Sequence, residues 1–300
     1  MPITKLDQML DALRSKPRKR LVAAAANDEH TIEAVKGGVD AGIVEATLVG
    51  DGSKIAAVCK KLGIPDGTFH ILDEPLENEA ASKAVAMVRS KAGDVLMKGS
   101  LSTDKYMKAI LHKEHGLMDH GAVLSHVTVI ENPRYHKLLI VGDVAVIPLP
   151  ELKEKTAILN YLVATAKALG IETPKVAALA ASEQVLPKMH ACVDAALLAK
   201  MGERGQIKGA IIDGPLALDV AIDKESAEIK GLSGPVCGDA DCLLFPNIET
   251  GNVFYKCMTK LAGCELGAVV AGAKAPCILS SRGDSVKTKL YSIALAAMTA

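Results

Sequence analysis

The most informative stretch of the chain is Pro276-Cys277-Ile278-Leu279-Ser280-Ser281-Arg282-Gly283-Asp284-Ser285. An apolar run stops at a Ser-Arg-Gly turn, and an apolar-periodic segment then continues to Ala300. This order predicts a strand, a tight turn and a helix. Such a turn brings together the Ser281 hydroxyl, the Arg282 guanidinium and free backbone N–H groups, which suit a phosphate or an oxyanion. Because open α/β sheets bind ligands at the carboxyl ends of their strands, we expect a functional site here.

The same alternation of short β-branched runs and longer amphipathic runs extends over the whole chain. Strands are predicted near 20–25, 45–49, 69–72, 95–98, 122–131, 137–141, 175–180, 209–212, 242–245, 267–271 and 277–280. Helices are predicted near 30–41, 53–62, 78–91, 103–113, 153–169, 188–201, 250–261 and 285–298. This order predicts an α/β fold with mostly parallel strands. The alternation breaks near 117–123, which predicts a second domain with its own sheet. Periodicity leaves open whether the last strand and helix return to the first domain.

The composition argues against several classes of partner. The chain has 300 residues, zero formal net charge, 3% aromatic residues and no Trp, which disfavours nucleic acid as a partner and stacking of bases on aromatic side chains. No apolar stretch approaches the ~20 residues that span a bilayer, so we expect no membrane association. The seven cysteines include no CxxC pair, which predicts reduced thiols in a cytoplasmic protein and no metal site.

A second turn suited to phosphate follows the predicted strand 95–98. The segment Lys98-Gly99-Ser100-Leu101-Ser102-Thr103 joins a strand end, a glycine turn and a Ser/Thr helix cap, but it lacks the Walker pattern. An ordinary strand-to-helix turn with a capping hydroxyl would have the same residues. The lysine at the strand end favours a ligand, so Lys98, Ser100 and Thr103 are candidate phosphate-binding residues.

Two further turns carry candidate substrate residues. Asp213 follows the predicted strand 209–212 and is suited to accept a hydrogen bond from substrate or to act as a base, although a capped turn would look the same. Farther on, Asn252 and Lys256 lie four residues apart in a predicted helix and are expected to share one face. Each of these signals is unspecific when taken alone.

Taken in order, the motifs resemble those of the phosphate acetyltransferase/butyryltransferase family, in particular its short butyryltransferase branch. They are 97–103, 213–219, 238–241, 251–256, 272–276 and 281–285, and they span nearly the whole chain. The resemblance implies reversible transfer of a short-chain acyl group, butyryl favoured, between CoA and inorganic phosphate. It also implies an isocitrate/isopropylmalate dehydrogenase-like fold of two α/β domains with a cleft between them. Residues 1–122 and 276–300 would form the first domain and residues 123–275 the second.

The resemblance also implies roles for individual residues. Ser281 would orient or stabilise the reacting thiol and carbonyl, and Arg282 would hold phosphate. Where the acetyltransferase branch has an aspartate as the proposed base, this chain has Thr288, and we take the nearby Asp284 as its replacement. Lys108 stands where that branch has an arginine, so it is a further candidate for phosphate binding. Asp213, Asn252 and Lys256 are then candidates for binding substrate or CoA.

The expected partners are acyl-CoA, phosphate and acyl phosphate, with CoA as a substrate and no tightly bound cofactor or metal. The resemblance further implies a homodimer or a higher homo-oligomer. Three other functions are alternatives: an acetyltransferase of the same family, a non-catalytic module that binds CoA or acyl phosphate, and an NAD-dependent hydroxyacid dehydrogenase. The last would need an ordered nucleotide-binding signature and metal-ligating aspartates, and no such ordered motif surrounds the aspartates of this chain.

Overall fold

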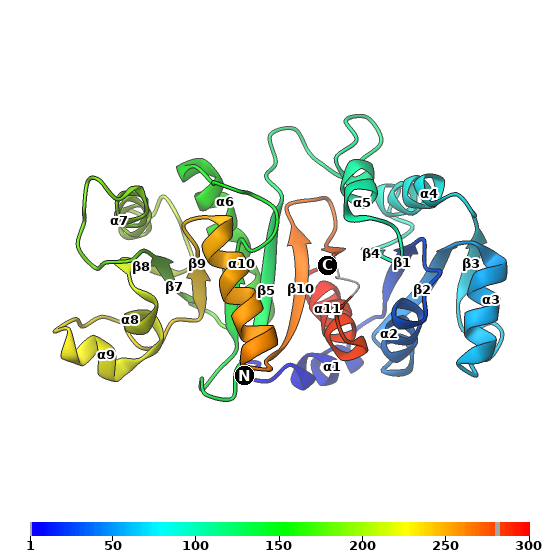
Figure 1. Ribbon diagram of the computed structural model, residues 1–300, viewed down its shortest axis with the longest axis horizontal. Helices are drawn as coiled ribbons and strands as arrows, with labels where there is room; N and C mark the ends of the chain where they lie inside the picture. The colour runs from blue at the N-terminus through cyan, green and yellow to red at the C-terminus, as the bar shows by residue number, and fades with distance from the viewer. Residues whose placement is uncertain (1, 280–282) are drawn as a thin grey trace. The chain divides into compact units, whose positions relative to one another are not determined.

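The computed structural model describes residues 2–279 and 283–300, so Ser281 and Arg282 lie outside the described residues (Figure 1). The chain divides into two compact units. The first unit consists of Leu6–Ala122 and Gly267–Ala300, and the second consists of Met1–Lys5 and Val123–Leu266.

The strands of the first unit follow the order β3-β2-β1-β4-β11-β10. Their bounds are Lys19–Ala24 (β1), Val44–Gly50 (β2), His70–Asp73 (β3), Val95–Lys98 (β4), Glu265–Ala271 (β10) and Cys277–Ile278 (β11). Neighbouring strands are parallel except for β10, which runs antiparallel to β11. Four successive residues at the end of β1 and all four of β4 are buried, as expected for strands covered on both faces.

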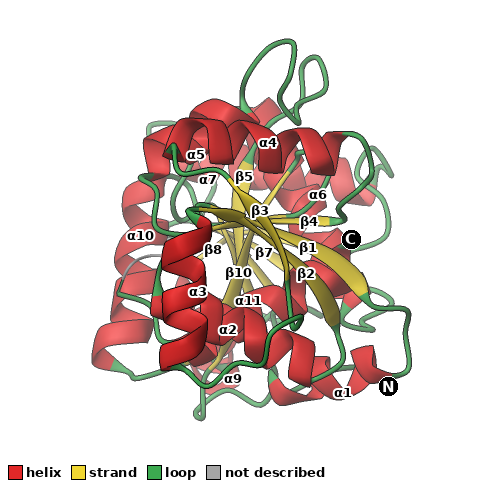
Figure 2. Ribbon diagram, turned by 90° about the vertical axis from the view of Figure 1, so that its right-hand side faces the viewer, coloured by secondary structure: helices red, strands yellow, loops and turns green. Residues whose placement is uncertain are grey.

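Helices cover both faces of this sheet. They are Asp7–Arg14 (α1), Glu29–Asp40 (α2), Gly52–Lys61 (α3), Glu77–Arg89 (α4), Thr103–Ile110 (α5) and Val286–Thr299 (α11). In Figures 1 and 2, α4 and α5 lie on one side of the strands, and α1, α2 and α11 lie on the other. Side-chain caps fix several helix starts; Asp28, for example, accepts a hydrogen bond from the backbone N–H of Thr31 (2.9 Å).

The second unit has its own mostly parallel strands in the order β5-β6-β9-β7-β8. Their bounds are Ser125–Glu131 (β5), Leu139–Gly142 (β6), Lys175–Leu179 (β7), Ile211–Leu216 (β8) and Cys242–Leu244 (β9). Among the strand pairs described within this unit, β5 and β6 form the only antiparallel pair, and the others are parallel. The register of β8 against β7 shifts between Asp213 and Leu216, so β8 carries a bulge there.

The helices of the second unit are Leu152–Ala168 (α6), His190–Glu203 (α7), Leu218–Ile222 (α8), Lys224–Ile229 (α9) and Ile248–Lys256 (α10). A π-helical turn, Cys257–Leu261, continues α10. The strands β7 and β8 lie between α7 on one side and α8 and α9 on the other (Figure 1). Among the described residues, no helix has the length and apolar character needed to cross a membrane.

The prediction of an α/β fold with mostly parallel strands is confirmed. The unit boundaries differ from the predicted domain limits, because β10 lies almost wholly in the first unit rather than the second. The cause is its pairing with β11 and the hydrogen bond from Ala268 N to Ser292 Oγ in α11 (3.0 Å). The final strand and helix therefore belong with the first part of the chain. Helices α1, α8 and α9 were not predicted.

Candidate functional site

In the first unit, the turn after β4 is held against the end of β1. Lys98, the last residue of β4, is only 3% exposed, and its Nζ donates to the carbonyl of Gly99 (3.2 Å). The backbone N–H of Gly99 donates to Ala24 O (2.8 Å), and that of Ser100 donates to Ala25 O (2.9 Å). A Cβ at Gly99 would lie 2.3 Å from Ala25 O, so only glycine fits here. The turn thus holds the buried Lys98 ammonium group next to backbone that leaves no room for a side chain at position 99.

The other predicted phosphate-binding residues of this unit are less closely grouped. The Ser100 hydroxyl donates to Ala25 O (2.9 Å), so its proton is directed to the backbone. Thr103 begins α5, whose start is capped by Ser102 accepting from the N–H of Lys105 (3.3 Å). Lys108 lies in the last turn of α5, ~8 Å along the helix axis from Thr103 and on a different side of the helix. Both side chains are exposed.

The turn that opened the sequence argument leads into α11. Asp284 is half-buried, and the next residue, Ser285, caps α11 by accepting from the N–H of Thr288 (3.0 Å). The Ser285 hydroxyl also donates to Thr288 Oγ1 (3.0 Å), so Thr288 serves the helix cap. Lys289, next along α11, is 4% exposed. The sequence analysis missed this buried charge, because only packing distinguishes it from an ordinary helix lysine.

In the second unit, Asp213 lies inside β8 and not after it, which corrects its predicted place. The strand continues because the bulge at Gly214-Pro215 accommodates the change of register. The Asp213 carboxylate accepts from Gly214 N (2.8 Å). A Cβ at Gly234 would lie 3.5 Å from Asp213 Oδ2 and 3.9 Å from Cys237 Sγ, so the carboxylate and the thiol lie close together. Burial and the nearby Asp213 charge raise the pKa of the Cys237 thiol.

The two candidates on α10 share an exposed face, as their spacing predicts, but one already has a protein partner. Asn252 donates through Nδ2 to Val144 O (3.0 Å) in the loop after β6. Beside it, Gly251 packs so tightly that an added Cβ would lie 2.2 Å from Asp143 O. The side chain of Lys256 instead reaches back over the Tyr255 ring, with Nζ 5.1 Å from its centroid. Asn252 therefore holds the loop after β6 in place.

Asp143, in that same loop, is a polar residue that the sequence analysis did not identify. It is 2% exposed, and its carboxylate accepts from the backbone N–H groups of Ala145 (2.7 Å), Val146 (3.0 Å) and Ile147 (3.2 Å). Three backbone donors satisfy the buried charge and fix the chain at the carboxyl end of β6. A carboxylate directly after a buried strand was the available signal.

A cluster of ion pairs lies at the amino-terminal ends of β6, β7 and β9. Asp239 contacts Lys175, Lys137 Nζ (2.8 Å) and His136 Nε2 (2.8 Å), and Asp241 contacts Lys137 Nζ (2.7 Å). Partial burial raises the pKa of the Asp239 carboxyl, but the hydrogen bonds from Lys137, Lys175 and His136 outweigh it and hold that pKa well below its usual range. These aspartates are therefore engaged by cations of the chain itself. Within residues 2–279 and 283–300, no cluster of three or more His, Cys, Asp or Glu is placed to hold a metal ion.

Comparison with known proteins identifies the family. A family profile described as "Phosphate acetyl/butaryl transferase" matches residues 66–297. The chain is 45% identical over 298 residues to a protein of Clostridium acetobutylicum named phosphate butyryltransferase, with 99% of each chain covered. It is 40% identical over 295 residues to one of Thermotoga maritima named phosphate acetyltransferase, covering 98% of this chain and 99% of the other.

Solved structures agree with this similarity. The fold matches a branched-chain phosphotransacylase from Enterococcus faecalis V583 with a TM-score of 0.82 and 28% identity, covering 94% of this chain and 98% of the other. A putative 4-hydroxythreonine-4-phosphate dehydrogenase from Salmonella typhimurium, 12% identical, shares the fold alone with a TM-score of 0.57, covering 94% of this chain and 100% of the other. The match to a dehydrogenase fold agrees with the predicted fold class. The chain belongs to the phosphate acetyltransferase and butyryltransferase family.

Proposed function

We propose that this protein transfers a short-chain acyl group, butyryl favoured, reversibly between CoA and inorganic phosphate. The observation that carries the proposal is the 45% identity over 99% of both chains with the Clostridium acetobutylicum protein named phosphate butyryltransferase. The similarity to the Thermotoga maritima protein named phosphate acetyltransferase makes acetyl the second candidate group. Butyryl is favoured because the identity is higher to the first protein.

The reaction needs a thiolate, an oxyanion site and a phosphate site. A free thiol has a pKa near 8.5, so only a few per cent of CoA is ionised at neutral pH without a base. The CoA sulfur attacks the carbonyl carbon of the acyl phosphate, the oxyanion forms, and the bond to the phosphate oxygen breaks. We assign the oxyanion to the Ser281 hydroxyl and the neighbouring backbone N–H groups, and one such donor contributes ~3 kcal/mol. Arg282, Lys98 and Lys108 would take the leaving phosphate, and Ser100 and Thr103 remain proposed further phosphate contacts.

The raised pKa values of the buried cysteine thiols favour direct transfer of the acyl group between the two substrates over an acyl-enzyme intermediate. Cys277 is the first residue of the buried strand β11, and burial raises the pKa of its thiol to about 12. Burial likewise raises the pKa of the Cys242 thiol. Because their pKa values are raised, both thiols remain protonated at neutral pH. They are unreactive there because the thiolate is the nucleophilic form.

The proposed base is Asp284. Its variant Asp284→Asn should lose most activity at pH 6–7, where CoA depends most on a base, and lose less towards pH 9. Asp104→Asn, an exposed carboxylate in the first turn of α5, is the matched control and should leave the profile unchanged. A wild-type profile for Asp284→Asn would remove this residue from the mechanism.

Arg282 provides the sharpest test of the phosphate role. Arg282→Ala should lower kcat/KM with butyryl-CoA and phosphate by about 100-fold or more, as loss of one transition-state donor typically does. Arg204→Ala, at the exposed end of α7, should behave like wild type. Activity of Arg282→Ala within a few-fold of wild type would exclude Arg282 from the reaction.

We further propose that the enzyme acts in the cytoplasm as a homodimer or higher homo-oligomer and holds no tightly bound cofactor. Asp213 and Lys256 remain proposed contacts to substrate or CoA, and Asn252 would support binding of the same molecules through the loop that it holds. Light scattering on the purified protein tests the oligomeric state. An absorption spectrum and metal analysis of the same sample test the absence of a cofactor.

A further inference from the structure

One residue with a strained backbone lies at the carboxyl end of β1, beside the turn after β4. Ala25 directly follows β1, is fully buried, and has a φ of +52°. For a residue with a Cβ, this left-handed conformation is about 5- to 30-fold less populated than the right-handed one. Such strain persists only where surrounding contacts hold it, and it is concentrated at functional sites. The contacts of Ala25 therefore indicate what this conformation does.

The end of a helix does not account for the conformation of Ala25. In the described part of the chain, the other non-glycine residue with a positive φ is Lys91 (φ +59°). Lys91 is exposed and follows the end of α4, where its N–H donates to Val88 O (3.0 Å) and the next amide, Ala92 N, donates to Met87 O (2.9 Å). A left-handed residue in that place is a common helix stop. Ala25 instead ends a strand.

The carbonyl of Ala25 holds the turn after β4. It accepts hydrogen bonds from the N–H of Ser100 (2.9 Å), from the Ser100 hydroxyl (2.9 Å) and from the N–H of Asn27 (2.9 Å). A Cβ at Gly99 would lie 2.3 Å from this carbonyl oxygen and 2.7 Å from its carbon, so the turn packs directly against it. Because three donors converge on one oxygen, the place of the turn depends on the direction in which this carbonyl points.

All of these residues lie in the first unit, at the edge of the sheet where the reaction is proposed to occur. The strands β1 and β4 are parallel, with Ala24 opposite Lys98. On its other side, β4 is parallel to β11, with Met97 opposite Ile278. The three strands therefore end at one edge, and the buried Lys98 ammonium group belongs to the turn that Ala25 holds.

We propose that Ala25 and Ser100 act together as positioning residues that hold the turn after β4 in the geometry needed for phosphate. The inference rests on the proposed function, and it adds a positioning role to the phosphate contact proposed for Ser100. The Ser100 hydroxyl donates to the Ala25 carbonyl and so stabilises the strained conformation. That conformation in turn keeps Gly99 and the Lys98 ammonium group in place.

The first test asks whether a glycine at position 25 rescues the loss of the Ser100 hydroxyl. Ser100→Ala should raise the KM for phosphate about fivefold, which is the usual effect of one net hydrogen bond, and leave the KM for butyryl-CoA within about twofold. Glycine adopts a positive φ without the Cβ penalty, so it needs the hydroxyl less. In Ala25→Gly enzyme, adding Ser100→Ala should raise the KM for phosphate by less than about twofold. An equal increase in both backgrounds, or none in either, would overturn the inference.

Ala23→Gly provides the matched control background. Ala23 lies two residues earlier, within β1, and is also fully buried, so this substitution removes the same methyl group from the same strand. Its φ is not positive, so it carries none of the strain. Ser100→Ala should still raise the KM for phosphate about fivefold in Ala23→Gly enzyme. Rescue by Ala23→Gly as well would mean that general loosening of β1 is responsible, and would overturn the role of Ala25.

Amide hydrogen exchange tests the positioning role without any turnover. Mass spectrometry of peptides that cover residues 99–103 should show exchange several-fold faster in Ser100→Ala than in wild type, and a return to the wild-type rate when Ala25→Gly is added. Exchange that is unchanged in Ser100→Ala, or that the second substitution fails to restore, would contradict the inference.

Failure of the proposed function would be recognised separately, as absence of phosphate-dependent turnover in wild type. Calorimetric titration with inorganic phosphate would then replace the kinetic test. Binding about fivefold weaker in Ser100→Ala than in wild type, with less than a twofold difference between Ala25→Gly and the double variant, would support the inference. Absence of phosphate binding to wild type, or an equal loss in both backgrounds, would overturn it.

Discussion

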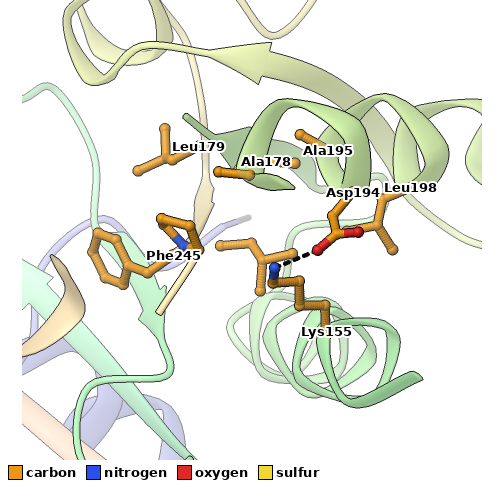
Figure 3. Close-up of a pocket in the computed structure, with 10 residues that line it drawn as sticks. Lys155, Ala178, Leu179, Asp194, Ala195, Leu198 and Phe245 are labelled. Carbon is orange, nitrogen blue, oxygen red and sulfur yellow. Dashed lines mark hydrogen bonds and ion pairs between the residues drawn. The ribbon is translucent and has the colours of Figure 1, made fainter. Parts of the chain in front are cut away.

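Removing one partner of the Lys155–Asp194 pair, which joins α6 to α7, should destabilise the protein more than removing both. Their charged atoms are 2.6 Å apart (Figure 3), and the side chains are 7% and 24% exposed among apolar neighbours such as Leu198 and Leu244. Breaking a buried pair costs ~3–5 kcal/mol, because the remaining charge stays uncompensated. Asp194→Leu leaves the more buried ammonium and should cost an amount in that range. Lys155→Met leaves the more exposed carboxylate and should cost ~2–3 kcal/mol.

The double variant Lys155→Met/Asp194→Leu places two apolar side chains where the pair was. Replacement of a buried pair by apolar residues of similar size is often neutral, so the double variant should stay within ~1 kcal/mol of wild type. The two single losses would then fail to add by ~4 kcal/mol or more. The corresponding substitutions at the exposed Lys200–Glu203 pair, Lys200→Met and Glu203→Leu, should show a coupling energy below ~0.5 kcal/mol.

Urea denaturation followed by far-ultraviolet circular dichroism suits this cycle, because the chain contains no Trp. Unfolding midpoints and slopes of the five variants and the double control would be compared at pH 7. A coupling below ~1 kcal/mol at Lys155–Asp194, or a Lys155→Met variant as stable as wild type, would refute the reasoning that this pair is buried and mutually compensating.

Other predictions concern separate features. Gly99→Ala should lower the free energy of unfolding by ~1–3 kcal/mol in urea titrations, because its Cβ would lie 2.3 Å from Ala25 O. Gly37→Ala, which has no such clash, should raise it by up to ~1 kcal/mol. Equal unfolding midpoints for the two variants would contradict this reasoning. The pKa of the Asp239 carboxyl is depressed on folding, so its stabilisation is present above the unfolded pKa of ~3.9 and lost as pH falls below it. Asp239→Asn should therefore lower the urea midpoint at pH 7 by more than at pH 3, and a pH-independent gap would count against the cluster. Lys108→Ala should raise the KM for phosphate and leave that for butyryl-CoA nearly unchanged; an unaltered phosphate KM would reject its role.

Local patterns predicted most of the secondary structure. The strand predicted at 95–98 is observed as Val95–Lys98, because a short apolar run between turns is a local signal. The α8 and α9 helices, of five and six residues, are too short to show helical periodicity. The α1 helix did have a signal, since buried Leu6, Met9 and Leu13 follow helical spacing, and the sequence analysis overlooked it.

The candidate site was less accessible from sequence, because its residues act through distant partners. Glycine and Ser/Thr patterns correctly marked the turn after β4. The carbonyl of Val144, which receives the Asn252 side chain, is 108 residues away in the chain. The burial of Lys289 and the place of Asp213 inside β8 likewise depend on tertiary packing and on strand register. No local pattern records such contacts.

The most direct test of the central claim is release of free CoA from butyryl-CoA, with and without inorganic phosphate, measured by thiol titration and repeated with acetyl-CoA. The account predicts release that depends on phosphate and is faster with butyryl-CoA than with acetyl-CoA. Absence of phosphate-dependent release with both substrates would contradict the proposed acyl transfer.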